Sequence, residues 1–185
     1  DPMFYVLWSI YIIGCVSGLM IIGHASPIGQ EVIKLSPATA AMCVGFLALA
    51  NTAGRIFWGW CSDKIGRLNA VKIMFILAGV MMFSLTQVTT FLPFVIVLMA
   101  IGLCFGGVMG IFPSITADTF GAKNLGMNYG IIFTAWGAAG LVEINKGDYT
   151  QAFLIAAGLS VAGVILTFVL EYSKKKATRS AIAQN

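Results

Sequence analysis

Uninterrupted apolar runs constrain the fold of this chain more than any other sequence feature. Long runs lie at 3–25, 38–61, 70–89, 92–115 and 152–171, and a shorter one lies at 128–142. A helix that rises ~1.5 Å per residue needs roughly 20 apolar residues to cross a hydrocarbon core of ~30 Å. The composition agrees, because 59% of the residues are hydrophobic and 10% are charged, whereas about a quarter are charged in a soluble domain. We therefore predict an all-α integral membrane protein with six transmembrane helices.

The fifth run is too short to cross a bilayer as it stands. It meets Glu143 directly after Val142, so it falls well below the roughly 20 residues that a span requires. We expect a span shortened near 142–143, either because apolar residues are missing from the sequence, which we favour, or because the helix is broken. The predicted division is a transmembrane bundle at 1–172 and a basic tail at 173–185.

Lysine and arginine are unevenly distributed between the connections. One set of segments holds most of them, at Lys64, Arg67, Lys72, Lys123, Lys174, Lys175, Lys176 and Arg179. The opposite connections hold only Lys34 and Lys146. The positive-inside rule therefore predicts a multi-pass protein of the cell inner (plasma) membrane with both ends of the segment in the cytoplasm. Because no initiator methionine or signal peptide precedes the first apolar run, we expect the N-terminus to be cut from a longer chain.

Several classes of function lack the residues that they need. The four cysteines show no paired spacing and there is one histidine, so we expect neither a disulfide framework nor a metal site. No nucleophile–base pair or phosphate-binding glycine loop is present, which argues against an enzyme and against a cofactor. The net charge of +4 is spread over the ends of the apolar runs, so a nucleic-acid partner is not expected.

Small and aromatic residues indicate how the helices pack and where they end. Gly102, Gly106 and Gly110 recur every four residues, as do Gly14 and Gly18, and such spacing lets helix backbones approach closely. Aromatic residues near the run ends fit a belt at the membrane interface: Phe4, Tyr5, Trp8, Trp58 and Trp60.

The segment 51–67, NTAGRIFWGWCSDKIGR, joins the second run to the third. Its form G-R-x-x-x-G-x-x-S-D-x-x-G-R resembles the loop signature of the major facilitator superfamily. That resemblance implies a conformational latch formed by Gly59, Asp63, Gly66 and Arg67, in which a charge pair at the cytoplasmic helix ends bridges neighbouring helices. The alternative is an ordinary positive-inside loop that contains an aspartate by chance.

Arg55 is the one strong charge inside a predicted span. It lies roughly 12 Å along the helix from Asp63. A guanidinium in hydrocarbon is costly, so such residues face a bundle interior or a wet cavity, and its fork of donors suits a carboxylate. The structural alternative is that Arg55 reaches the interface or pairs with Asp63.

Within the superfamily, the chain resembles the oxalate/formate antiporter family, a relative of the monocarboxylate transporters. The likeness rests on the 51–67 motif, on FPSITADTFGAKNLGMNYG at 112–130 and on GIIFTAWG at 130–137. It implies that the six spans are the C-terminal half of a twelve-helix bundle whose N-terminal six-helix half is a partner in the same transporter. It also places Arg55 where the family has an arginine that holds a substrate carboxylate. We expect Arg55 and aromatic residues such as Trp136 to hold a small organic anion.

One departure from the family narrows the expected substrate. Oxalate-exchanging members have a lysine at the position of Trp136, so this half offers one positive centre. We therefore expect a monocarboxylate such as formate, lactate or pyruvate, moved by alternating access. His24 at the outer end of the first span could couple transport to protons, or could simply cap that end.

Two other readings remain open. The first is a major facilitator transporter of an uncharged metabolite or drug, for which Arg55 would be structural. The second is a truncated membrane module without transport activity. In every case membrane lipid is the expected surrounding partner.

Overall fold

The computed structural model describes residues 2–140 and 149–183 and is entirely helical over these ranges. The helices are α1 (Pro2–Glu31), α2 (Pro37–Ile65), α3 (Arg67–Leu85), α4 (Phe91–Phe120), α5 (Leu125–Gly140) and α6 (Tyr149–Ala183). Their order confirms the prediction of an all-α membrane bundle with six helices.

Local chemistry explains where the helices begin and end. The Ser36 hydroxyl accepts a 3.2 Å hydrogen bond from the Thr39 backbone N–H, and Pro37 occupies the first turn of α2, where a missing N–H costs nothing. α2 ends at Gly66, whose φ of +88° is accessible to glycine at little cost. Gly121, with φ +84°, ends α4 in the same way.

Five of the helices are long and apolar enough to cross a membrane, namely α1, α2, α3, α4 and α6. α5 has 16 described residues and falls short of that length, as the short fifth run indicated. The predicted shortening near 142–143, and Lys146, lie outside the described residues.

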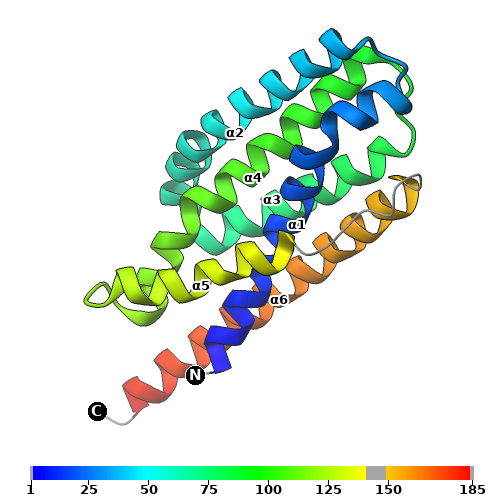
Figure 1. Cartoon of the computed structure of the whole chain (residues 1–185). Helices are drawn as coiled ribbons and strands as arrows, with labels where there is room; N and C mark the ends of the chain where they lie inside the picture. The colour runs from blue at the N-terminus through cyan, green and yellow to red at the C-terminus, as the bar shows by residue number, and fades with distance from the viewer. Residues whose placement is uncertain (1, 141–148, 184–185) are drawn as a thin grey trace.

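The helix ends gather at two sides of the bundle, as Figure 1 shows. The N-terminus, the C-terminus, the α2–α3 turn and the α4–α5 connection lie at one end, whereas the α1–α2 and α3–α4 connections lie at the other. The segments richest in lysine and arginine therefore share one end, which is the arrangement that the charge distribution predicts.

Glycines allow α4 to pack closely on two neighbours. A Cβ at Gly102 would lie 2.8 Å from the Leu47 carbonyl oxygen of α2, and one at Gly106 would collide with the Asn51 backbone. On the other side, a Cβ at Gly14 of α1 would lie 3.0 Å from Val108 of α4. The glycine spacing in the sequence thus predicted real contacts, and α4 is the centre of the bundle.

The position of Trp58 differs from the prediction, which placed it in an aromatic belt at the membrane interface. Its side chain is 5% exposed and packs against Gly107 of α4, because the face of α2 that carries Trp58 is the face that meets α4. Trp60, two residues later on the same helix, is exposed.

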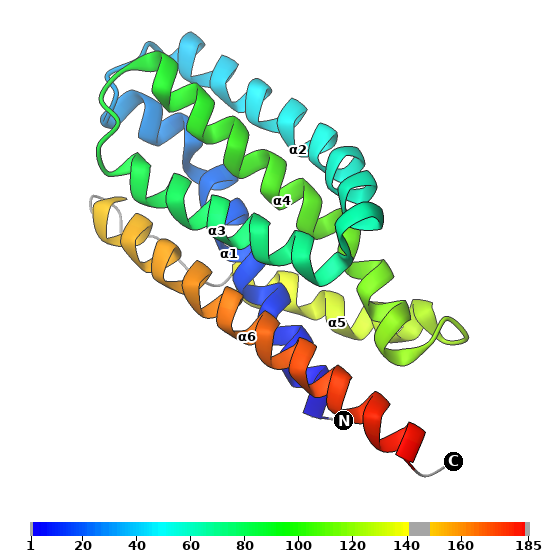
Figure 2. The same cartoon turned by 180° about the vertical axis from the view of Figure 1, so that it is seen from behind.

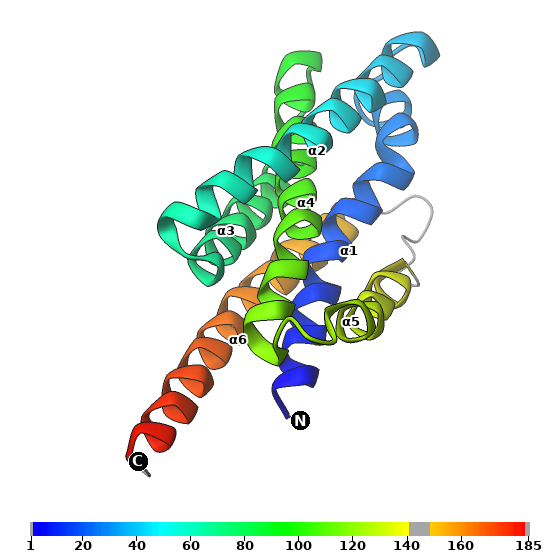
Figure 3. The same cartoon turned by 90° about the vertical axis from the view of Figure 1, so that its left-hand side faces the viewer.

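α3 and α6 form a second pair, away from α5. Figure 2 shows the two helices side by side, and Figure 3 shows α5 on the opposite side of α1 and α4. Gly79 brings α3 close to α6, since a Cβ there would lie 3.1 Å from the Ser160 Cβ. An ion pair between Lys72 Nζ and Glu171 Oε2, 2.8 Å apart, joins the same two helices near the end that holds the C-terminus.

Candidate functional site

An aromatic cluster fills the junction of α1, α4 and α5. Tyr11 of α1 is fully buried, and its ring stacks on Phe112 of α4 with centroids 4.2 Å apart. Tyr129 and Phe133 of α5 lie 6.4 and 6.2 Å from Tyr11. We call these rings, together with Trp136, the aromatic cluster.

The hydroxyl groups of the aromatic cluster are paired with each other. Tyr11 Oη donates to the Met109 sulfur at 3.5 Å. Because this uses the one proton of Tyr11, Tyr129 Oη is the donor in the 3.0 Å bond between the two hydroxyls. A ligand that accepts a hydrogen bond from either hydroxyl must therefore replace one of these two bonds.

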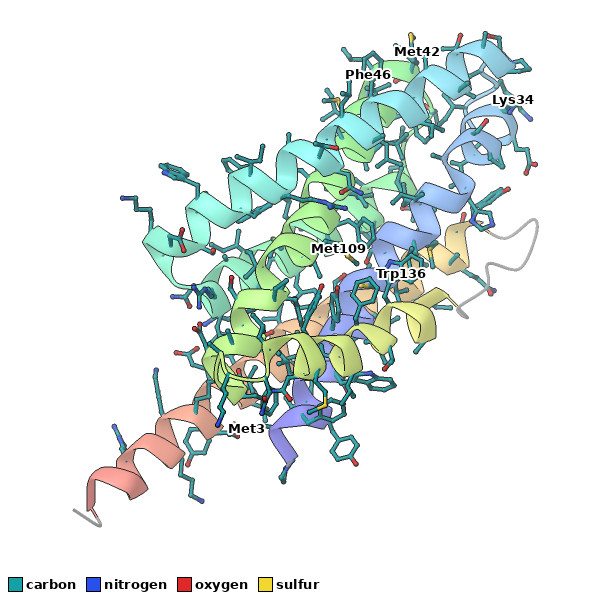
Figure 4. The ribbon with its side chains drawn as sticks, turned by 60° about the vertical axis from the view of Figure 1, so that its left-hand side comes forward. Met3, Lys34, Met42, Phe46, Met109 and Trp136 are labelled. Carbon is teal, nitrogen blue, oxygen red and sulfur yellow. The ribbon has the colours of Figure 1, made fainter. Side chains whose placement is uncertain are left out.

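Trp136 extends the aromatic cluster along α5. Its ring stacks on Phe133 with centroids 6.0 Å apart and 7° between planes, and it is 41% exposed. Figure 4 shows Trp136 and Met109 near the middle of the bundle, whereas Lys34, Met42 and Phe46 lie toward one end and Met3 toward the other.

Arg55 lies on α2, across from the aromatic cluster. Its backbone packs on Gly110 of α4, where a Cβ would come 3.2 Å from the Arg55 Cα, and the residue is exposed. Gly110 adjoins Met109, whose sulfur contacts Tyr11 Oη, so Arg55 and the paired hydroxyls approach the same turn of α4. Among the described residues it has neither a hydrogen bond nor an ion pair, so the alternative of an Arg55–Asp63 pair is not what the structure contains.

Asn51 adds a polar group that the sequence reasoning missed. It lies one turn before Arg55 on α2, and its side-chain Oδ1 is buried without a hydrogen-bond partner among the described residues. A buried amide oxygen that lacks a partner is costly. The motif NTAGR contained this signal, since the spacing from Asn51 to Arg55 places both on one helix face.

His24 lies apart from the aromatic cluster, near the far end of α1. Its Nδ1 donates to the Met20 carbonyl oxygen of its own helix at 3.1 Å. This contact lies within α1, which continues to Glu31, so His24 does not cap the end of the helix. A role in proton coupling stays a prediction.

The segment predicted as a latch lies at the end of the bundle that holds both termini. Gly66 makes the turn between α2 and α3, Gly59 meets open space, and Asp63 is exposed. Arg67 forms its ion pair with Asp118 of α4, not with Asp63, and donates to the Ser114 carbonyl oxygen at 3.3 Å. Arg67 therefore joins α3 to α4 through Asp118, a residue outside the predicted latch, because the first turn of α3 faces the last turn of α4. A latch function stays a prediction.

The described residues contain no group of three or more histidine, cysteine, aspartate or glutamate side chains that could hold a metal ion. The residues brought together are thus a cation, two paired hydroxyls and aromatic rings. Such a set can bind an anion with an apolar body.

Comparisons with known proteins indicate the family of this chain. The model of the Major Facilitator Superfamily matches residues 1–142. The chain is 32% identical over 140 residues to the uncharacterized MFS-type transporter YhjX of Escherichia coli (strain K12), covering 74% of this chain and 34% of the relative. It is 29% identical over 179 residues to the oxalate:formate antiporter of Oxalobacter formigenes, covering 91% and 43%.

A third relative is the apicoplast pyruvate carrier 2 of Toxoplasma gondii, 32% identical over 127 residues that cover 65% of this chain and 20% of the carrier. The chain therefore spans less than half the length of these relatives. Since the family model covers well over half of the chain, the chain belongs to the Major Facilitator Superfamily.

Proposed function

We propose that this chain forms the C-terminal half of a secondary transporter that moves a small carboxylate anion across the cell inner membrane by alternating access. A second six-helix half would supply the opposite wall of the cavity. Both ends of the segment would face the cytoplasm, and the substrate would pass through chemically unchanged.

The main support for this proposal is that the positive charge of Arg55 has no partner among the described residues. A guanidinium keeps its charge at any physiological pH, and on a membrane-spanning helix a charge without a partner is costly. Arg55 has no partner among the described residues, and it packs on Gly110 of α4, beside the Met109 that contacts Tyr11 Oη. A carboxylate would supply the missing negative charge and accept two parallel hydrogen bonds.

The aromatic cluster supports an anion with a small apolar body. Trp136 and Phe133 present ring faces beside the paired hydroxyls, and no second cation belongs to the set. A monocarboxylate such as formate, lactate or pyruvate needs one cation, whereas a dicarboxylate such as oxalate would leave one negative charge unpaired. The relatives named as an oxalate:formate antiporter and a pyruvate carrier are consistent with this class of substrate.

Uptake by the transporter that contains this chain, reconstituted in liposomes, tests the proposal. Labelled formate, lactate, pyruvate and oxalate are compared with and without a pH gradient, and protein-free liposomes are the control. We expect saturable uptake of at least one monocarboxylate in preference to oxalate. Uptake that is confined to uncharged solutes, or absent for every carboxylate, would contradict the proposal.

A further inference from the structure

An apolar groove lies between α3 and α6. Its volume is about 550 Å³, within the range of roughly 300–1,000 Å³ that is usual for ligand pockets. Its wall consists of side chains from both helices, among them Phe75, Gly79 and Phe83 of α3 and Gly158, Val161 and Ile165 of α6. Of the residues that line it, Ser160 alone carries a polar side chain.

The groove faces away from the candidate substrate site. α3 and α6 lie on the side of the bundle opposite α5 (Figure 3), the helix that carries Tyr129, Phe133 and Trp136. Both α3 and α6 are candidate membrane spans. Phe83, Val161 and Ile165 on its rim are each more than half exposed. In a bilayer this surface meets hydrocarbon, so the medium that surrounds the protein fills the groove.

Charged residues close the end of the groove that lies toward the C-terminus. One turn beyond the groove on each helix lie Lys72 and Phe168, and the Lys72 ammonium sits 4.4 Å from the Phe168 ring centroid. Glu171 joins Lys72 and Lys175, each at 2.8 Å. Arg179 is exposed one turn further along α6, so it adds a positive charge beyond the ion pairs. Two lysines and an arginine against one glutamate leave this end positively charged.

The length of the groove matches the thickness of the hydrocarbon layer in one leaflet of a bilayer. At ~1.5 Å of rise per residue, Lys72 and Phe83 are about 16 Å apart along α3. Half of a ~30 Å hydrocarbon core is about 15 Å. An acyl chain that begins at the charged end therefore ends near Phe83, where the groove opens.

We propose that the groove between α3 and α6 binds one acyl chain of an anionic phospholipid, whose phosphate lies against Lys175 and Arg179. The apolar wall recognises the chain, and the positive end selects the headgroup. Lys72 and Glu171 hold α3 and α6 together at the junction between the apolar groove and its positively charged end. Each cation near a membrane surface changes the affinity for an anionic headgroup on the order of fivefold, so a zwitterionic lipid of equal chain length binds less tightly.

Two sets of variants separate the groove from the headgroup contacts. Gly158 lines the groove, and a Cβ there has nothing within 4 Å, so Gly158→Leu places an apolar side chain in the groove. Gly23→Leu is its control, since Gly23 on α1 also meets open space. The double variant Lys175→Gln/Arg179→Gln removes the two exposed cations, and Lys123→Gln, an exposed lysine at the α4–α5 connection, is the control for charge.

Native mass spectrometry of the transporter that contains this chain provides the readout, with titrations of dioleoylphosphatidylglycerol and of dioleoylphosphatidylcholine. We expect the wild-type protein to retain the phosphatidylglycerol at least fivefold more tightly. Gly158→Leu should weaken retention of both lipids, whereas the double variant should reduce phosphatidylglycerol to the level of phosphatidylcholine. Both controls should match the wild type.

Equal retention of the two lipids by the wild type would overturn the headgroup assignment. Unchanged retention in Gly158→Leu would overturn the groove as the site. A protein dimer that Gly158→Leu dissociates would show that a second copy covers the groove, and that result would also overturn the proposal. The Lys175 and Arg179 substitutions are at exposed positions, so their result does not depend on how well Gly158→Leu folds.

Discussion

A guanidinium on a membrane-spanning helix is stable only when something compensates its charge. Arg55 has no such compensation among the described residues. The nearest polar groups that the structure indicates are Asn51, one turn earlier on α2, and Tyr11, which contacts the Met109 beside Gly110. The sequence indicated Arg55 and Trp136, because charge and the family likeness single them out. It could not indicate Tyr11 and Tyr129, since nothing in the sequence says that α1 and α5 meet at those turns.

Arg55→Lys and Arg55→Ala test the proposed carboxylate contact. A lysine keeps the charge but loses the two parallel hydrogen bonds, so Arg55→Lys should weaken transport strongly. Removing one member of a buried charged pair costs about 2–5 kcal/mol, which is tenfold in affinity per ~1.4 kcal/mol, so Arg55→Ala should nearly abolish binding. Anion binding and uptake are measured at equal membrane abundance, and identical behaviour of all three proteins would make Arg55 structural.

Tyr129→Phe tests the paired hydroxyls. A hydrogen bond contributes about 0.5–1.5 kcal/mol, so loss of the Tyr129 hydroxyl should weaken anion affinity by roughly three- to tenfold if that group contacts the substrate. Tyr5→Phe is the matched control, because Tyr5 is 68% exposed near the start of α1. An equal effect of both substitutions on the KM for uptake would argue against a role for the pair.

At the scale of helices, the glycine spacing correctly predicted which helix faces are in contact. The position of an aromatic residue near a helix end did not predict whether that residue is exposed. Gly102, Gly106 and Gly110 fall on one face of α4 because four residues are close to one helical turn, and that face meets α2. The prediction for Trp58 was wrong, since nearness to a helix end does not say which face of the helix is buried. Likewise, the charge pair at Arg67 was expected, but its partner on α4 depends on the tertiary packing.

Gly106→Ala tests the contact between α2 and α4. The added methyl group would collide with the Asn51 backbone, and overpacking of this kind costs about 1–3 kcal/mol. The thermal midpoint in detergent should therefore fall. Gly130→Ala of α5 is the control, because a Cβ there has nothing within 4 Å, and alanine in a helix is about 0.5–1 kcal/mol better than glycine. A midpoint that falls equally in both variants would show that the effect is not due to the helix contact.

Asp118→Asn tests the bridge between α3 and α4. An ion pair that holds one arrangement of helices biases the conformational equilibrium without contacting the anion. Its loss should lower the transport rate while substrate affinity stays within a few fold. Asp63→Asn measures in parallel whether the exposed aspartate of the 51–67 motif contributes to the latch. A large loss of affinity at an unchanged rate would instead indicate that this end of the bundle binds substrate.

At the scale of the whole chain, the apolar runs and the distribution of charge predicted the helix count and the shared end of the basic segments. Five helices are long enough to span a membrane, and their connections alternate between the two ends (Figure 1). The pairing of α2 with α4 and of α3 with α6 could not be predicted, because an amphipathic pattern is weak when lipid replaces water around the bundle. For the same reason, the sequence did not predict the groove between α3 and α6.

The orientation of the bundle in the membrane is the last prediction. Single cysteines at positions 34, 64 and 175, introduced as Lys34→Cys, Lys64→Cys and Lys175→Cys, replace side chains that lie at the two ends of the bundle. The background must lack Cys15, Cys43, Cys61 and Cys104, of which Cys61 is the most accessible. An impermeant thiol reagent should reach position 34 from outside intact cells and positions 64 and 175 only after the membrane is opened, because lysine and arginine near spans are retained in the cytoplasm. Labelling of positions 34 and 64 from the same side would contradict the fold itself, since α2 separates them. Labelling of all three with the sides exchanged would leave the fold intact and reverse the direction in which the Arg67–Asp118 bridge faces the cell.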